Sequence, residues 1–428
     1  LLLVMILFMA LLDMLGVASI MPFIAVLTNP NLVETNEILN TAYEFSSIFG
    51  VETNQQFLFV LGIFVFILLI ISLAFKALTN YAQVRFARMR ESSVGKRLLE
   101  GYLHQPYSWF LNRHSAELSK TILSDVSLVI SKGFAPLMIL ITQSAVTIAL
   151  FILLIIVDLK LTLIIIITFS LAYGLVYRLN KNLMTRIGKA IFKANQERFG
   201  VLTEAFGASK EVKVGGLEKT YINRFSNPSK TLAQTIALEA LVNQLPRFIL
   251  EAVAFGGMLL VVLYLMAQGS DITNVIPVIA LYAFAGYRLM PALQHIYISL
   301  TQMRIVGPAL DSIHNDLKNL QLNIVDKIEN PLQFNKEITL NHIHYNYPNA
   351  SRTALKDINM SIPVRKTVGL VGATGSGKTT IADIILSLLE AQQGTLEADG
   401  VVINKNNQRA WQSSIGYVPQ QIFLSDDT

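Results

Sequence analysis

Long apolar stretches divide most of the chain into alternating nonpolar and polar segments. Six of these stretches are long enough for a helix that crosses a bilayer, which takes about 20 residues. They are residues 1–28, 57–78, 131–157, 159–180, 241–268 and 274–298. The pattern therefore predicts an all-α transmembrane domain with six spans over residues 1–310.

Two connecting segments, 79–130 and 181–240, are long and nearly free of proline, and they continue the helical period of the spans beside them. Each is predicted to form a helical hairpin that extends well beyond the membrane. The tips are expected at 113–120 and 208–217, and the second of these contains a pair of glycines that breaks a helix.

The first connector, 29–56, contains a shorter amphipathic pattern at 37–49. It predicts a helix on the outer surface whose apolar face holds Ile38, Leu39, Ala42, Phe45 and Phe49. A helix packed on the spans for stability and a helix with a functional role both agree with this pattern.

The pattern changes from long helices to short strands and turns at Lys336. Strands are predicted at 337–345, 354–363 and 366–371, after a linker at 311–335. Residues 336–428 are therefore expected to begin an α/β domain.

Composition supports a membrane protein. Hydrophobic residues make up 53% of the chain and charged residues 15%, which is unusual for a soluble protein. Cysteine is absent, which excludes disulfides and thiolate metal sites. The chain starts inside an apolar run, and we expect it to be a fragment cut at both ends. A signal peptide is not expected, because residues 1–28 lack a basic region and are too long for the apolar core of a signal peptide.

The distribution of lysine and arginine predicts the orientation. Residues 1–75 contain neither, whereas the connectors 79–130 and 181–240 are rich in both. Positive charge stays on the cytoplasmic side of a membrane. The two hairpins and the domain after span six are therefore expected in the cytoplasm, and the protein is expected to be a multi-pass protein of the inner (plasma) membrane.

Residues 372–379 read GATGSGKT, which fits the phosphate-binding P-loop pattern. An apolar segment precedes the loop and a helical pattern follows it, as the motif requires. The glycines let backbone N–H groups turn toward phosphate oxygens, Lys378 is expected to reach the β- and γ-phosphates, and Thr379 to bind Mg²⁺. The predicted nucleotide-binding residues here are Gly372, Ala373, Thr374, Gly375, Ser376, Gly377, Lys378, Thr379 and Thr380.

Three basic residues, Lys76, Arg247 and Arg288, fall within or at the end of spans, toward the inner leaflet. Ionisable groups in a membrane are candidates for function, and a ring of cations suits an anionic lipid headgroup. Interfacial anchoring is the simpler alternative, and Arg247 is also spaced to pair with Glu251 on one helix face. Asp13, in span one, is expected to be a buried hydrogen-bonding group.

Two further positions indicate a family. Tyr347 precedes a proline upstream of the P-loop, and Gln420 lies in the segment IGYVPQQIFL at 415–424. Together with the P-loop, these resemble an ATP-binding cassette (ABC). The resemblance implies that Tyr347 stacks on adenine and that Gln420 is the Q-loop residue that contacts Mg²⁺. ATP and Mg²⁺ are the implied cofactors.

Six spans followed by one cassette resemble the ABC exporter half-transporters, in which the hairpin tips contact the cassettes. This implies a homodimer that couples ATP hydrolysis to transport. The run EAFGASKEVKVGGL at 204–217, with the outer amphipathic helix, resembles the PglK-type flippases, which implies a lipid-linked oligosaccharide substrate. Multidrug, lipid or peptide export is the alternative within the class, and a nucleotide-gated channel or regulator is the alternative outside it. Membrane lipids are expected partners and nucleic acid is not.

The chain departs from the cassette pattern after Thr428, where it stops. The signature motif, the Walker B strand with its catalytic glutamate and the switch histidine do not occur in residues 336–428. The expected fold is thus a six-helix bundle followed by the N-terminal part of an α/β nucleotide-binding domain. We expect ATPase activity in the full-length protein and none in the chain as given.

Overall fold

The computed structural model describes residues 1–30, 32–48, 51–113, 115–267, 272–320, 330–348, 350 and 352–419. The chain divides into two compact units, which we describe separately. The first unit, called the bundle, comprises Leu1–Leu99 and Ser115–Asn319. The second, called the sheet unit, comprises Glu100–His114 and Leu320–Thr428.

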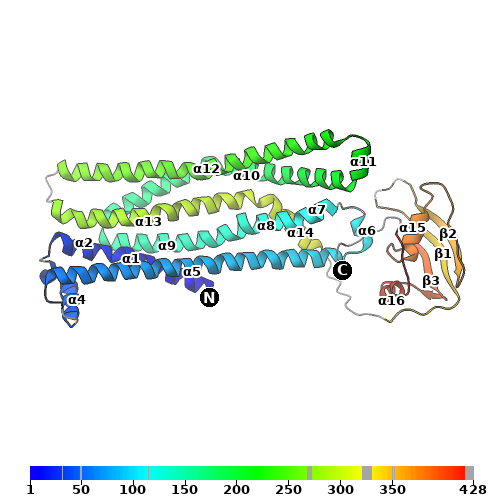
Figure 1. Ribbon diagram of the computed structural model, residues 1–428, viewed down its shortest axis with the longest axis horizontal. Coiled ribbons are helices and arrows are strands. Elements are labelled where there is room, and N and C mark those ends of the chain that lie inside the picture. The colour runs from blue at the N-terminus through cyan, green and yellow to red at the C-terminus, as the bar shows by residue number, and fades with distance from the viewer. Residues whose placement is uncertain are drawn as a thin grey trace. The chain divides into compact units, whose positions relative to one another are not determined.

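Long helices form the bundle and run side by side along it (Figure 1). They are α1 (Leu2–Ala18), α2 (Ile20–Thr28), α5 (Asn54–Leu103), α9 (Ala135–Val157), α10 (Leu159–Gly207), α12 (Glu218–Ala267) and α13 (Ile272–Ile305), followed by α14 (Gly307–Asn319). Within the described residues, four helical segments are long and apolar enough to cross a membrane: Leu2–Thr28, Asn54–Leu103, Ser115–Val157 and Thr162–Gly207. Helices α12 and α13 contain the predicted spans five and six, and most side chains between 253 and 279 lie outside the described part.

The third pass is a continuous helix from Ser115 to Val157 that contains two π-helical turns. Its parts are α7 (Ser115–Lys120), η1 (Thr121–Asp125), α8 (Val126–Val129), η2 (Ile130–Phe134) and α9. The predicted tip at 113–120 is thus mostly helix. The interruption lies earlier, around the short helix α6 (Tyr107–Phe110), because Pro106 ends the preceding helical path and caps α6. At the second tip the structure has α11 (Ser209–Val214), followed by Gly216 with φ 61°.

The core of the bundle lies between α1, α9 and α13, where Met9, Leu150, Leu154, Leu281 and Leu289 are buried together. The outward faces carry large apolar side chains instead of polar ones: Phe66, Ile70 and Leu171 are at least half exposed. Helices that are apolar on all sides are typical of a membrane, where lipid replaces water.

Two short helices, α3 (Leu32–Thr35) and α4 (Glu37–Ser47), follow the first pass. The side chain of Asn36 caps α4 by accepting hydrogen bonds from the N–H groups of Ile38 and Leu39. The predicted helix is confirmed, but its packed face differs from the prediction. Leu39 is buried, and Tyr43 packs edge-on against Phe57 at 5.3 Å, whereas Ile38 and Phe45 are exposed.

Within the described residues, the sheet unit has a four-stranded sheet in the order β2-β1-β3-β4 with antiparallel pairing throughout. The strands are β1 (Glu337–Tyr345), β2 (Leu355–Pro363), β3 (Gln393–Ala398) and β4 (Val401–Val402), and the helices are α15 (Lys378–Ile385) and α16 (Gln408–Gln412). The first two predicted strands are confirmed, the second within one residue of its predicted start.

The third predicted strand, 366–371, does not pair with the sheet, and Val371 is 97% exposed. The prediction of a buried strand is wrong for this structure. A buried parallel strand needs hydrogen-bonding neighbours in its sheet, and no described strand runs beside this segment. The helix predicted after the loop is confirmed as α15.

The core of the sheet unit surrounds Trp411, which is fully buried among Leu340, Ile343, Leu355 and Ile384. The indole N–H of Trp411 donates to the carbonyl of Ile385 at 2.7 Å, which ties α16 to the end of α15. This contact fixes the helix that begins at the P-loop against the sheet.

Candidate functional site

The P-loop of the sheet unit takes a backbone shape that glycine favours. Gly375 and Gly377 have φ values of 81° and 90°, which L side chains rarely adopt. A Cβ atom on Gly377 would lie 2.6 Å from Leu355 Cδ2 and 2.9 Å from the carbonyl oxygen of Ala354. The strand β2 and the loop therefore fit together only with glycine at this position.

Lys378, the first residue of α15, folds its side chain back over the loop. Its Nζ donates to the carbonyl oxygens of Gly372 and Ala373, at 2.8 and 2.9 Å. These carbonyl oxygens are neutral acceptors. The anionic oxygens of a phosphate bound in the loop would be stronger acceptors for the same ammonium group. The glycine cradle and this ammonium fit the phosphates of a nucleotide, which would bring the phosphoryl group for transfer and its Mg²⁺.

Tyr347, predicted to stack on adenine, lies next to the P-loop helix. Its hydroxyl is 3.1 Å from the hydroxyl of Thr380, which is 5% exposed on α15. Its ring also meets the ring of Tyr345 edge-on at 5.1 Å. These contacts bring Tyr347 and the P-loop together from segments far apart in the sequence.

Other predicted nucleotide contacts are less defined. Ala373, Thr374 and Thr379 are exposed, and no hydrogen bond of the Thr379 side chain is recorded among the described residues. Its role as an Mg²⁺ ligand stays a prediction. Gln420 lies outside the described residues.

Tyr107 on α6 interacts electrostatically with Asp383 and Tyr347, and sequence reasoning missed it. It belongs to the sheet unit, and burial raises the pKa of its phenol, with further contributions from the Asp383 carboxylate and from Tyr347. Burial also raises the pKa of Asp383. The aromatic run Tyr-Ser-Trp-Phe directly after Pro106 is the signal in the sequence that could have drawn attention to this segment.

In the bundle, Lys76 and Arg288 meet at one carboxylate, that of Asp13. Asp13 is fully buried, forms an ion pair with Arg288 through Oδ1, and lies with Oδ2 3.7 Å from Lys76 Nζ. Ser72 Oγ donates to Oδ1 at 2.7 Å. The prediction that Asp13 is a buried hydrogen-bonding group is confirmed. We call Asp13, Ser72, Lys76 and Arg288 the Asp13 cluster.

Arg247 does not share this carboxylate. Its Nε donates to Glu251 Oε1 at 2.7 Å, one turn further along α12, which is the structural pairing that the sequence left open. The three cations therefore use two separate acids instead of forming one ring.

Arg247 also lines a cavity of about 430 Å³ between α12 and α13. The side chains of Asn243, Gln244, Gln294 and Gln302 line it too. Asn243 accepts a hydrogen bond from Thr301 at 3.0 Å, whereas no hydrogen bond of the three glutamine amides is recorded among the described residues. We call this space the amide cavity.

Comparison with known families agrees with both units. Residues 3–291 match the ABC transporter transmembrane region, and residues 355–428 match the ABC transporter domain. The chain is 24% identical over 340 residues to an ATP-dependent lipid A-core flippase of Wigglesworthia glossinidia brevipalpis, covering 78% of this chain and 58% of that protein. It is 25% identical over 345 residues to an ATP-dependent lipid A-core flippase of Yersinia pestis, covering 78% of this chain and 57% of that protein.

A solved structure described as a bacterial Atm1-family ABC exporter with ATP bound has the same fold. The TM-score is 0.65 at 16% identity, and the match covers 96% of this chain and 69% of that one. The chain thus spans a little over half the length of its curated relatives. Apolar membrane helices and a P-loop occur in one chain, and this chain belongs to the ABC transporter family, with the fold of its exporters.

Proposed function

We propose that the full-length protein is an ATPase that flips an anionic, amphipathic lipid across the inner membrane, working as a dimer of two copies. The relatives named lipid A-core flippases support a lipid substrate. The observation that carries the proposal is the Asp13 cluster, a charged site inside the same chain as the P-loop.

The charge balance of the Asp13 cluster favours an anionic ligand. Two cations share one carboxylate, and neither Lys76 nor Arg288 pairs with another acid among the described residues. One positive charge is therefore left over in a place where charge is costly. The Lys76 side chain is 41% exposed and that of Arg288 15%, so the ammonium group of Lys76 is the more accessible.

The amide cavity supports a sugar headgroup. Amide side chains both donate and accept hydrogen bonds, and those of Gln244, Gln294 and Gln302 have groups available for sugar hydroxyls. Arg247 beside them suits a phosphate oxygen. A lipid-linked oligosaccharide, which the sequence favours, and a lipid A-core type of glycolipid share this chemistry of sugar plus phosphate.

Coupling to ATP would begin at the sheet unit. The loop N–H groups and Lys378 bind the phosphates, and Tyr347 holds the base. In the exporter resemblance, the signature motif of a second copy completes each nucleotide site, and this supports a homodimer. Closure of the two sites would move α6, since Tyr107 belongs to the same compact unit as Tyr347.

The test uses full-length protein in proteoliposomes and measures flipping of polyprenyl-pyrophosphate glycans and of a lipid A-core glycolipid. Lys76→Gln and Arg288→Ala are expected to slow flipping of either substrate at least tenfold and leave basal ATP hydrolysis unchanged. Lys193→Gln, an exposed cation on the second hairpin, serves as the matched control.

Unchanged flipping in both variants would refute the role of the Asp13 cluster. If Gln294→Ala slows flipping of the glycan lipid but not of a phospholipid, this would support the amide cavity as the headgroup site. Steady ion current through the reconstituted protein would instead favour a nucleotide-gated channel.

A further inference from the structure

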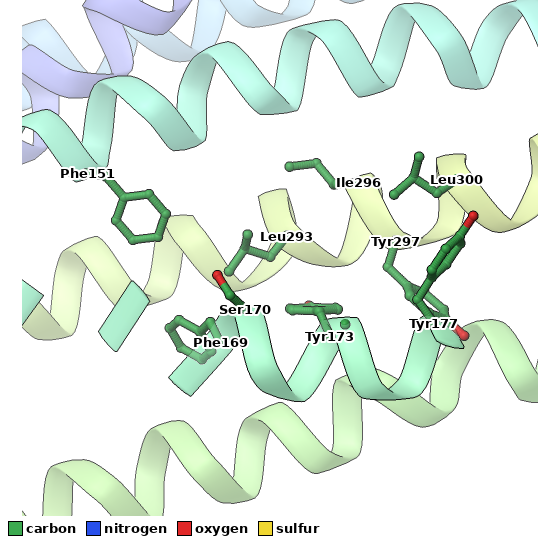
Figure 2. Close-up of a pocket in the computed structure, with 10 residues that line it drawn as sticks. Phe151, Phe169, Ser170, Tyr173, Tyr177, Leu293, Ile296, Tyr297 and Leu300 are labelled. Atoms are coloured by element: carbon green, nitrogen blue, oxygen red, sulfur yellow. The ribbon is translucent and has the colours of Figure 1, made fainter. Parts of the chain in front are cut away.

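A second cavity lies in the bundle between α9, α10 and α13. Its volume is about 240 Å³, and its walls are mostly aromatic and aliphatic. Figure 2 shows Phe169, Tyr173 and Tyr177 of α10 across from Leu293 and Tyr297 of α13. The cavity has no lining residue in common with the Asp13 cluster or the amide cavity.

One buried hydroxyl at this cavity makes no hydrogen bond within the described part of the protein. Tyr173 Oη is buried and has no hydrogen-bond partner among the described residues. The neighbouring phenols are engaged: Tyr297 accepts from Asn180 Nδ2 at 3.3 Å, and Tyr177 accepts from Arg304 Nε at 3.3 Å. A buried donor without a partner costs about 1–3 kcal/mol, so the cavity calls for a ligand with an acceptor.

The depth of Tyr173 narrows the choice of ligand. At 1.5 Å per residue, Tyr173 lies about 21 Å and Tyr177 about 27 Å along α10 from its outer end. The hydrocarbon core is about 30 Å thick, which places Tyr177 near the inner boundary of the core and Tyr173 between one and two helical turns further into it. Water is scarce there, and the acceptors that lipid supplies at this boundary are the ester carbonyls of phospholipids.

The polarity of the site follows the order of groups in a phospholipid. Arg304 is exposed at the cytoplasmic end, the hydroxyls of Tyr177 and Tyr173 come next, and the walls beyond are apolar. Arg304 uses its Nε for Tyr177, and no bond of its two Nη groups is recorded among the described residues. These groups are available for a phosphate oxygen.

We propose that this cavity holds one acyl chain of an inner-leaflet phospholipid as a resident ligand, with Tyr173 donating to the ester carbonyl and Arg304 binding the phosphate. At about 240 Å³ the cavity is smaller than the pockets of about 300–1,000 Å³ that hold drug-sized ligands, so it has room for part of one acyl chain and not for a whole lipid. This lipid is a component of the folded bundle and is not the transported substrate, so the inference stands apart from the proposed function.

The test places the purified full-length protein in nanodiscs with phosphatidylglycerol that carries a diazirine on one acyl chain. After photolysis, label is expected on peptides that contain Phe169–Tyr177 and Leu293–Leu300. Tyr173→Phe keeps the ring and removes the donor, and it is expected to lower labelling about fivefold, the value of one hydrogen bond. Tyr287→Phe, on an exposed tyrosine of α13, is the matched control.

Two more variants separate the parts of the site. Gly174 lines the cavity, and a Cβ atom there meets nothing within 4 Å, so Gly174→Phe is expected to fill the space and abolish labelling. Arg304→Gln is expected to lower labelling, because it removes the guanidinium group that binds the lipid phosphate.

Equal labelling of the parent protein, the Tyr173→Phe variant and the Gly174→Phe variant would overturn the proposal. Loss of labelling when Mg-ATP is added before photolysis would also overturn it, because a transported lipid leaves the cavity and a resident lipid stays. Labelling does not require transport, so loss of flipping activity leaves this test intact.

Discussion

At the scale of single residues, the partners of the charged groups decide what each of them can do. The sequence around Arg288 shows no acid one turn away, yet Asp13 binds it from the start of the chain. Arg247, by contrast, pairs locally with Glu251. Local spacing therefore identified one of these pairs, and the other required the packing of α1 against α13.

Lys120 and Asp125 form a buried ion pair, and removing one partner shows how much the stability of the fold depends on the pairing. Their side chains are 3% and 2% exposed, Nζ lies 2.9 Å from Oδ2, and the ammonium group sits 3.7 Å from the centre of the Phe192 ring. Lys120→Met leaves a buried carboxylate without its partner and is expected to lower the free energy of unfolding by about 3–5 kcal/mol. Denaturant unfolding of the detergent-solubilised chain measures this.

The double variant Lys120→Met, Asp125→Leu is the control. Removing both charges is expected to restore most of the lost stability, since neither group is then left unpaired. A double variant as unstable as Lys120→Met would contradict the assignment of the loss to the unpaired carboxylate.

Tyr347 gives a residue-scale prediction for nucleotide binding. An aromatic platform contributes about 1–3 kcal/mol per stacked base, so Tyr347→Ala is expected to raise the Kd for Mg-ATP about 5- to 150-fold. Tyr347→Phe keeps the ring, loses only the contact with Thr380, and is expected to bind within a few-fold of the parent protein. Titration calorimetry on the full-length protein tests both, and equal Kd values for the alanine variant and the parent would rule out stacking.

At the scale of elements, one close approach between two helices depends on glycine. A Cβ atom on Gly188 of α10 would lie 2.3 Å from the carbonyl oxygen of Ile305, the last residue of α13. Gly188→Ala is therefore expected to force the two helices apart and destabilise the bundle by about 1–3 kcal/mol.

Gly200 on the same helix is the matched position, because a Cβ atom there meets nothing within 4 Å. Gly200→Ala is expected to stabilise the helix by about 0.5–1 kcal/mol. Thermal unfolding of the two variants should shift in opposite directions. A shift of the same sign in both would refute the close contact between α10 and α13.

The turn between β3 and β4 provides an element whose stability depends on pH. Asp399 and Gly400 both have positive φ, 50° and 83°, as a two-residue hairpin turn requires. The Asp399 carboxylate accepts from the backbone N–H groups of Asn335, Lys336 and Glu337 at 2.6, 2.8 and 2.9 Å. These bonds, that of Asn335 foremost, lower the pKa of Asp399.

Because the pKa is lower in the folded state, this contribution to stability is present above the unfolded-state value of about 3.9 and is lost as pH falls through the folded-state value. Asp399→Asn tolerates the same backbone and removes the charge. Its deficit in stability relative to the parent is expected to be full at pH 7 and to vanish below that window. Fluorescence of the buried Trp411 during unfolding follows this unit, and a deficit that persists at low pH would contradict the explanation.

At the scale of the whole molecule, the proposed function requires coupling between the P-loop and the bundle. Lys378→Ala removes the ammonium group from the phosphate cradle and is expected to abolish both ATP hydrolysis and lipid flipping in the full-length protein. Proteoliposome assays of the two activities measure this. Flipping at the usual rate in this variant would show that the P-loop does not drive transport.

The sequence by itself determined the long helices, the first two strands and the nucleotide loop, because these depend on local pattern: long apolar runs, short alternating segments, and a glycine-rich motif followed by a helix. It did not determine which side chains meet. The pairing of Arg288 with Asp13, the electrostatic interaction of Tyr107 with Tyr347 and the unpaired segment 366–371 depend on segments far apart in the sequence. Tertiary packing decided those contacts, since burial and neighbouring strands are properties of the assembled units and not of any one stretch.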